Sequence, residues 1–322
     1  MKSIKKLFML LTLFSLTQIN AQDIIARAKE LLEANKNQEA INLLLENESI
    51  SNKPTYNEFL GLGYNRLNNI DKAIYFLNKC TEQDDKNAEC FYLLGSTYID
   101  KLNTIENFIK KGSVALDAKN NLLKAVDLKP SHVNARVLLS NYYINSPVIV
   151  GGSTRKAKIQ ANEIIKYDPV TGNNLLASIA QKNEDFEEAE AYYLKVLELE
   201  RSNERIRYSL SSLYFETENY DKAFSYAQSS INQFPEYLQS YYQYAKIASV
   251  SKTNIEIAMQ HIRHFIDTSD ENSFPKPHWA YYRLGMLEHI NGKNEDAKDA
   301  LKKALKLKPG FSNAEELLKE IN

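Results

Sequence analysis

Small and large apolar residues recur along the chain in a fixed order, with a period of about 34 residues. In residues 54–87, large apolar residues stand at the seventh, eleventh and twenty-fourth positions, and small ones at the eighth, twentieth and twenty-seventh: Leu60, Tyr64 and Leu77, then Gly61, Ala73 and Cys80. Residues 204–237 and 278–311 repeat the order. Two helices joined by a turn approach closely only where a small residue removes bulk, and larger apolar residues then fill the seam. The pattern therefore predicts a repeated helix hairpin.

An alanine marks the twentieth position of the regular units and the matching place in the units whose length or register departs from the repeat. The alanines are Ala40, Ala73, Ala118, Ala157, Ala189, Ala223, Ala258 and Ala297. Proline often ends a unit, as at Pro235 and Pro309, because the second helix must stop there. This arrangement resembles the tetratricopeptide repeat, a unit of two antiparallel helices. Eight units are predicted, near residues 22–53, 54–87, 88–132, 133–169, 170–203, 204–237, 238–271 and 278–311.

The resemblance implies an all-α fold: an α-solenoid of about eight tetratricopeptide helix-turn-helix units, wound into a right-handed superhelix. A short helix at 312–321, with a polar face, is suited to capping the stack. Because each unit of a solenoid packs only on its neighbours, we expect residues 22–322 to form one continuous array. The weakest point of that array is expected near residues 268–277.

Two neighbouring units are longer than the repeat. Eleven extra residues lie between Gly95 and Ala118, and since eleven residues make almost three helical turns, one long second helix is predicted over 104–128. The next unit carries five extra residues in the loop 146–154, where Ser153 is the predicted helix cap.

Both insertions are apolar, and two interpretations remain open. Ile105 and Phe108 either cover the loop residues Val148 to Val150, or enclose with them the cavity of a small-molecule or lipid carrier. The loop sequence is similar, over fewer than ten residues, to a segment of exported repeat proteins of Gram-negative bacteria. These include accessory proteins of periplasmic solute transporters.

The N-terminus has the order of a secretory signal peptide. A basic start at residues 1–6 precedes an apolar run from Leu7 to Leu16, and the small residue Ala21 follows. We expect cleavage after Ala21 and an exported protein, in the periplasm or associated with the outer membrane. An amphipathic anchor is the alternative interpretation, although the polar face that it needs is missing. No later segment has the length of a membrane span.

Charge and motifs argue against nucleic-acid binding and catalysis. The formal net charge is -1, and removal of residues 1–21 takes away three lysines and no acid, which leaves -4. A nucleic-acid-binding surface normally needs the opposite sign. The sequence also lacks phosphate-loop, nucleophile-elbow and zinc-protease motifs, and the pair His261 and His264 has no third ligand at a suitable spacing. We therefore expect no enzyme activity, no cofactor and no metal.

The chain has only two cysteines, Cys80 and Cys90. They are expected near each other on antiparallel neighbouring helices, at the end of one unit and the start of the next. Because exported proteins meet oxidising machinery, a disulfide is one interpretation, if the Cα atoms lie within about 7 Å. The other is that two small apolar residues pack in a repeat seam.

Aromatic residues gather on the first helices of the C-terminal repeats. As the resemblance implies, first helices line the concave face of the stack, which places Tyr208, Tyr242, Trp279 and Tyr282 in its groove. Partly exposed rings suit an extended peptide or a partner's helix. The same tyrosines could instead pack between repeats. The Lys and Asn pair by which chaperone-binding members of the family hold a carboxylate is absent at the matching positions, so that mode of carboxylate capture is not predicted.

The sequence thus favours an exported, non-enzymatic scaffold that binds a protein or peptide partner in its concave groove. The alternative function is a periplasmic small-molecule or lipid carrier, or a transport accessory protein.

Overall fold

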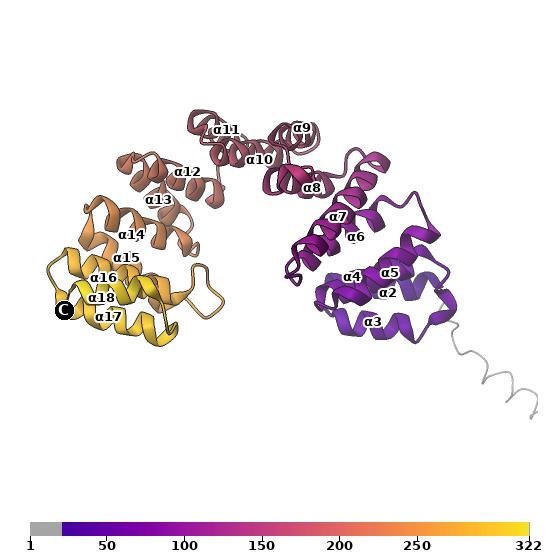
Figure 1. Ribbon diagram of the computed structural model, residues 1–322, viewed down its shortest axis with the longest axis horizontal. Helices are drawn as coiled ribbons and strands as arrows, with labels where there is room; N and C mark the ends of the chain where they lie inside the picture. The colour runs from indigo at the N-terminus through magenta and orange to yellow at the C-terminus, as the bar shows by residue number, and fades with distance from the viewer. Residues whose placement is uncertain (1–20, 322) are drawn as a thin grey trace, which may run out of the picture. The chain divides into compact units, whose positions relative to one another are not determined.

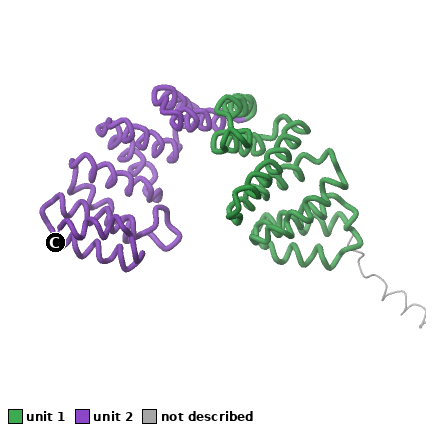
Figure 2. Tube along the Cα trace, in the orientation of Figure 1, with its two compact units in different colours: residues 1–167 green, residues 168–322 purple. Residues whose placement is uncertain are grey.

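The computed structural model describes residues 21–321, so the expected signal peptide lies outside the described residues except for Ala21. Within this range the chain forms α-helices and two short 3-10 helices, and no strand. The chain divides into two compact units, residues 1–167 and 168–322 (Figure 2). Each unit is an all-α stack of helix hairpins, the architecture of a helical repeat solenoid (Figure 1). The handedness of the superhelix stays a prediction.

Unit 1 holds four hairpins in which successive helices pair in chain order. Its elements are α2 (Ala21–Glu33), α3 (Asn37–Leu45), η1 (Glu48–Ile50), α4 (Pro54–Arg66), α5 (Ile70–Gln83), α6 (Ala88–Leu102), α7 (Phe108–Leu128), α8 (Val133–Asn145), η2 (Val148–Val150) and α9 (Thr154–Ile165).

Unit 2 holds four further hairpins and a final single helix. Its elements are α10 (Pro169–Lys182), α11 (Phe186–Leu199), α12 (Glu204–Glu216), α13 (Tyr220–Gln233), α14 (Gln239–Ser251), α15 (Ile255–Thr268), α16 (Pro277–Ile290), α17 (Asn294–Leu307) and α18 (Ser312–Glu320). The last helix covers the end of the α16–α17 hairpin, where Phe311 and Ala314 are buried against Leu301 and Ala304.

Polar caps set the starts of many helices. Asn69, Asn203 and Asn219 each accept a hydrogen bond from a backbone N–H in the first turn of the helix that follows. Ser153 accepts from Lys156 N in the same way, which fixes the start of α9. These bonds satisfy donors that have no partner inside the helix.

Some hairpins close with glycine on the first helix against leucine on the second. In α4–α5, a Cβ on Gly61 would stand 2.4 Å from Leu77 Cγ. The same clash would occur between Gly95 and Leu122 in α6–α7, and between Gly285 and Leu301 in α16–α17, each at 2.8 Å. Because real Cβ atoms do not approach so closely, glycine is what lets each leucine fill the seam.

Other hairpins use serine at the eighth position instead. Ser211 Oγ in α12 donates a hydrogen bond to the Ala223 carbonyl of α13 at 2.8 Å, and Ser140 Oγ in α8 donates to the Ala157 carbonyl of α9 at 3.1 Å. The residue four places beyond the anchor alanine is then Ala227 or Ala161, in place of leucine. A hydroxyl and a smaller partner thus replace the fit of leucine against glycine.

The long helix of unit 1 is shorter than the sequence indicated. It begins at Phe108 and not at residue 104, because Asn107 caps it by accepting a hydrogen bond from Lys110 N. The expectation that Phe108 covers the loop at Val148 is also wrong. Phe108 and Val148 are both strongly exposed, and so are Ile109 and Ile149. These four side chains therefore do not enclose a carrier cavity either.

Candidate functional site

Unit 2 contains a pocket of about 360 Å³ lined by rings and cations. Three helices and one connecting segment supply its walls. The lining residues are Tyr208 from α12, Tyr242 and Lys246 from α14, Trp279 and Arg283 from α16, and Phe274, Pro275 and Lys276 from the segment that precedes α16. Trp279 and Arg283 stand four residues apart on one helix, as do Tyr242 and Lys246, so each pair shares a helix face.

The rings of the pocket are held in place by further aromatic contacts. Tyr208 meets Tyr237 edge to face, with ring centroids 6.2 Å apart. Trp279 packs edge-on against Phe311, at 4.7 Å between centroids, which ties the pocket wall to the residue before the capping helix. Phe274, in contrast, is largely exposed. The pocket thus has a fixed aromatic wall and an accessible ring beside it.

Arg283 is a buried cation in the wall of the pocket. It is only 9% exposed, and its guanidinium has no carboxylate partner within the described residues. Nη1 donates to Ser249 Oγ at 2.7 Å, and Nε has no hydrogen-bond partner. The guanidinium carbon lies 5.9 Å from the ring centroid of Tyr242, within range of a cation–π contact. A buried cation without a counter-ion is costly, which makes the site attractive to an anion.

Two lysines extend the positive charge of the pocket. Burial lowers the pKa of Lys246 and the nearby Arg283 guanidinium lowers it further, while the Glu216 carboxylate opposes the fall. Lys246 Nζ lies 4.5 Å from the ring centroid of Phe215. Lys276 is exposed, and its Nζ donates to the Glu271 carbonyl at 2.6 Å. An anionic group in the pocket would relieve the repulsion between Lys246 and Arg283.

Comparison with known proteins supports the fold on which this pocket is built. One family model of the tetratricopeptide repeat matches residues 174–237, and a second model of that repeat matches residues 280–311. The chain belongs to the tetratricopeptide repeat family. No curated protein matches the sequence.

Solved tetratricopeptide repeat structures extend the likeness over most of the chain. A tetratricopeptide repeat protein from Parabacteroides merdae ATCC 43184 is 16% identical, with a TM-score of 0.56, over 81% of this chain and 95% of that one. PilF from Pseudomonas aeruginosa is also 16% identical, with a TM-score of 0.53, over 73% of this chain and 98% of that one. At such identities the likeness shows the fold alone.

Three of the four aromatic residues expected in the groove of this tetratricopeptide repeat protein line the pocket: Tyr208, Tyr242 and Trp279. Tyr282 does not; its ring packs instead against Phe311, with centroids 5.5 Å apart. Tyr242 serves both interpretations of the sequence, because it lines the pocket and is also buried against Phe265.

Sequence reasoning missed the cationic wall. Arg283 and Lys276 are not among the site residues that the sequence predicts, because the repeat positions single out rings and do not show which neighbouring cations line a pocket. The spacing of Trp279 and Arg283 was the available signal. The sequence predicts only a weak point of the array near residues 268–277, whereas Phe274 to Lys276 line the site.

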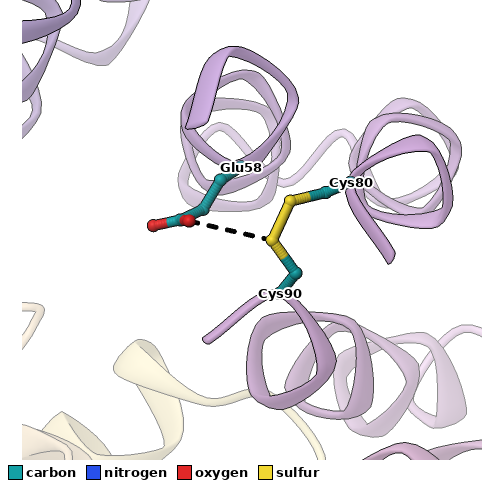
Figure 3. Close-up of side chains that lie close together, drawn as sticks. All are labelled: Glu58, Cys80 and Cys90. Atoms are coloured by element: carbon teal, nitrogen blue, oxygen red, sulfur yellow. Dashed lines mark hydrogen bonds between the residues drawn. A yellow bond between two sulfur atoms is a disulfide. The ribbon is translucent and has the colours of Figure 1, made fainter. Parts of the chain in front are cut away.

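Cys80 of α5 and Cys90 of α6 are joined by a disulfide, with their Cα atoms 6.0 Å apart (Figure 3). Glu58 of α4 points at this bridge, and its Oε2 lies 3.7 Å from Cys90 Sγ. Burial raises the pKa of Glu58, while a hydrogen bond from Asn87 Nδ2 opposes the rise. A disulfide sulfur carries no hydrogen, so a hydrogen bond along this line needs the protonated carboxyl of Glu58 as its donor.

The carboxylate and the two sulfurs also lie close enough together to surround a metal ion. Metal binding needs thiolates, however, and the disulfide consumes both.

Within residues 21–321, no helix combines the length and the apolar character needed to cross a bilayer.

Proposed function

We propose that this chain is an exported, non-enzymatic scaffold that binds a protein or peptide partner through the pocket of unit 2. The tetratricopeptide repeat fold itself suggests an interaction scaffold, and members of the family are generally non-catalytic. The single observation that carries the proposal is the buried Arg283 guanidinium, which has no carboxylate partner within the described residues and lies beside exposed aromatic surface.

The chemistry of the pocket defines the partner. Arg283, Lys246 and Lys276 select an acidic group, because a charge-assisted hydrogen bond to a desolvated guanidinium is strong and directional. Trp279 and Phe274 add apolar and aromatic contact area beside it. The proposed ligand is a peptide segment in which an acidic side chain or terminal carboxylate stands next to an aromatic or aliphatic residue.

Export is part of the proposal and rests on the sequence of residues 1–21. The basic start, the apolar run and the small residue at Ala21 support secretion, and a disulfide is in keeping with an oxidising compartment. Fractionation of the native host, followed by N-terminal sequencing, tests it. A mature chain that begins at Gln22 in the envelope fraction is the expected result, and an uncleaved chain among cytosolic proteins would refute it.

Trp279 provides a direct measurement of binding because it is the single tryptophan of the chain. Titration with short acidic-aromatic peptides should change its fluorescence, and the same peptides with glutamine for glutamate should bind less well. Arg283→Gln should weaken the acidic peptides about 10- to 100-fold, the usual size of a charge-assisted hydrogen bond. Lys302→Gln, which removes a cation outside the pocket, is the matched control and should leave affinity unchanged.

The same variants sharpen a recovery experiment in cell envelopes. The protein should retain a partner that Arg283→Gln loses and Lys302→Gln keeps. Equal recovery by all three proteins, together with no preference for acidic peptides, would remove the pocket from the proposed function.

A further inference from the structure

Unit 1 exposes four apolar side chains on two segments that the repeat does not require. Phe108 and Ile109 open α7 and are 73% and 82% exposed; Val148 and Ile149, in η2, are 85% and 87% exposed. We name these four residues the apolar tip. Apart from Phe274, the other exposed large apolar side chains that the structure describes are at most 55% exposed, so exposure of this extent on both inserted segments needs a separate explanation.

The segment that bears Val148 and Ile149 is held against α7. Val150 Cγ1 lies 3.7 Å from the point where a Cβ on Gly112 would stand, which places η2 beside the first half of the helix. The Tyr142 hydroxyl donates a hydrogen bond to the Val150 carbonyl, and Ser153 N donates to the Tyr143 carbonyl at 2.8 Å. The left-handed Gly151, with φ of 97°, then turns the chain toward α9. The loop is therefore anchored at Val150, while the two residues before it stay exposed.

Cations outnumber acids in the two segments that bear the apolar tip. Residues 104–119 and 146–156 contain five cations, Lys110, Lys111, Lys119, Arg155 and Lys156, against two acids, Glu106 and Asp117. The local formal charge of +3 is opposite in sign to the -1 of the whole chain. Lys119 Nζ lies 3.6 Å from the point where a Cβ on Gly151 would stand, so the helix brings a cation to the loop itself.

We propose that the apolar tip docks unit 1 on an anionic lipid surface. Phe108, Ile109, Val148 and Ile149 enter the boundary between headgroups and acyl chains, and the surrounding lysines and Arg155 meet lipid phosphates. Apolar insertion and attraction to anionic lipid are the two terms that hold peripheral proteins on membranes, and this surface supplies both. The contact needs no membrane-crossing helix.

Charge selects this occupant over a second copy of the chain. Two copies meeting at the apolar tip would bring like charges together, whereas an anionic bilayer offers the opposite charge over its whole area. The inference does not depend on the pocket of unit 2, because the four residues of the apolar tip all lie in unit 1 and the pocket residues all lie in unit 2.

Vesicle co-sedimentation tests the proposal with the oxidised full chain from residue 22. The probe is a vesicle of equal parts phosphatidylglycerol and phosphatidylcholine, compared with pure phosphatidylcholine. Binding to the anionic vesicles should exceed binding to the neutral ones at least about tenfold, and should fall as salt is raised because the attraction is screened.

Two variants separate the apolar and the electrostatic contributions. Phe108→Ser with Ile149→Ser should lower partitioning into anionic vesicles about tenfold or more, because two large apolar side chains no longer enter the bilayer. Lys110→Gln with Lys111→Gln should lower it about tenfold and reduce the dependence on salt. Tyr75→Ser with Leu307→Ser is the matched control, since both residues are about half-exposed and lie outside the apolar tip.

Three outcomes would overturn the proposal: no binding to anionic vesicles, equal binding to both vesicle types, or unchanged binding by the Phe108 and Ile149 variant. Concentration-dependent dimerisation that the same variant abolishes, without vesicle binding, would instead assign the surface to a second copy. Peptide titration monitored by Trp279 should be the same in all these variants. Failure of the lipid proposal and failure of the peptide pocket are therefore distinguishable.

Discussion

The hairpins α4–α5 and α12–α13 fill the seam between their two helices with different pairs of side chains. In α4–α5 the first helix contributes Gly61 and the second contributes Leu77, whose Cγ would clash with any Cβ at position 61. In α12–α13 the first helix contributes Ser211, whose hydroxyl donates to the Ala223 carbonyl, and the second contributes the small Ala227. The difference shows that the seam constrains the pair of residues together, and neither of them alone.

The largest effect should come from breaking the glycine–leucine pair. Leu77→Ala should lower the free energy of unfolding by about 3 kcal/mol, because Leu77 is fully buried and leaves a cavity. Gly61→Ala should cost about 1–2 kcal/mol, since overpacking outweighs the better helix propensity of alanine. Urea denaturation, with hydrogen exchange of the α4 and α5 amides, measures both.

The double variant, Gly61→Ala with Leu77→Ala, decides whether the two residues act as a pair. Because the truncated side chain at position 77 leaves room for a methyl group at position 61, the double variant should be at least about 1 kcal/mol more stable than the sum of the single effects predicts. Simple additivity would contradict the comparison.

The second effect concerns the disulfide that joins the α4–α5 hairpin to α6. Reduction of the Cys80–Cys90 bridge, which closes a short loop between α5 and α6, should cost about 2–3 kcal/mol in the chain-entropy account. Hydrogen exchange should accelerate in α5 and α6 and not in α12 and α13. Cys80→Ala with Cys90→Ala should match the reduced protein and be insensitive to dithiothreitol. Equal acceleration in both regions would argue against a local role.

The anchor positions were predictable because they follow from local geometry that repeats. Ala73, Ala223 and Ala297 are all fully buried, as a close helix approach requires, and their spacing alone identified the hairpins. The start of α7 was harder to predict from the sequence. Asn107 caps this helix because the chain leaves the helical conformation after α6, and the apolar periodicity over residues 104–128 does not show that break.

The pocket was predictable only in part for a similar reason. Tyr208 and Tyr242 stand at the fifth position of successive units and Trp279 at the second position of the next, so the repeat itself pointed to them. Arg283 became important through a property that no single sequence position shows, namely burial without a counter-ion among the described residues. Likewise, the exposure of Phe108 depends on where the loop of residues 146–154 lies in space.

A third experiment converts one seam toward the other. Ala227→Leu in α13 should cost about 1–3 kcal/mol, because the added atoms meet Ser211 and the first helix cannot retreat freely. Ser211→Gly in the same chain should recover part of that loss by recreating the arrangement of Gly61 with Leu77. Thermal unfolding of the two variants is the measurement. If the glycine gives no recovery, the seams differ by more than this pair.

The smallest expected effect depends on pH and lies in α14–α15, where Ala245 takes the place of the glycine or serine. Burial lowers the pKa of His261, and the neighbouring His264 lowers it further. Below the ordinary histidine pKa of about 6.5, the unfolded chain takes up a proton that the folded chain resists, so stability should fall as pH falls through that value.

The pH effect should remain below about 1 kcal/mol, since His261 is partly exposed. Unfolding of the protein and of His261→Gln at pH 7.5 and 5.5 isolates it, and the variant should lose less stability on acidification. An equal loss in both proteins would assign the pH dependence to other groups.

The bond between Cys80 and Cys90 also shows whether a given molecule has been exposed to an oxidant. A chain in which it has formed is lighter by two hydrogen atoms than a chain kept among cellular reductants. The cysteine pair therefore works as an internal label, and the intact mass of protein taken straight from its host, weighed without any added reagent, tells whether that molecule has met an oxidant or stayed among reductants.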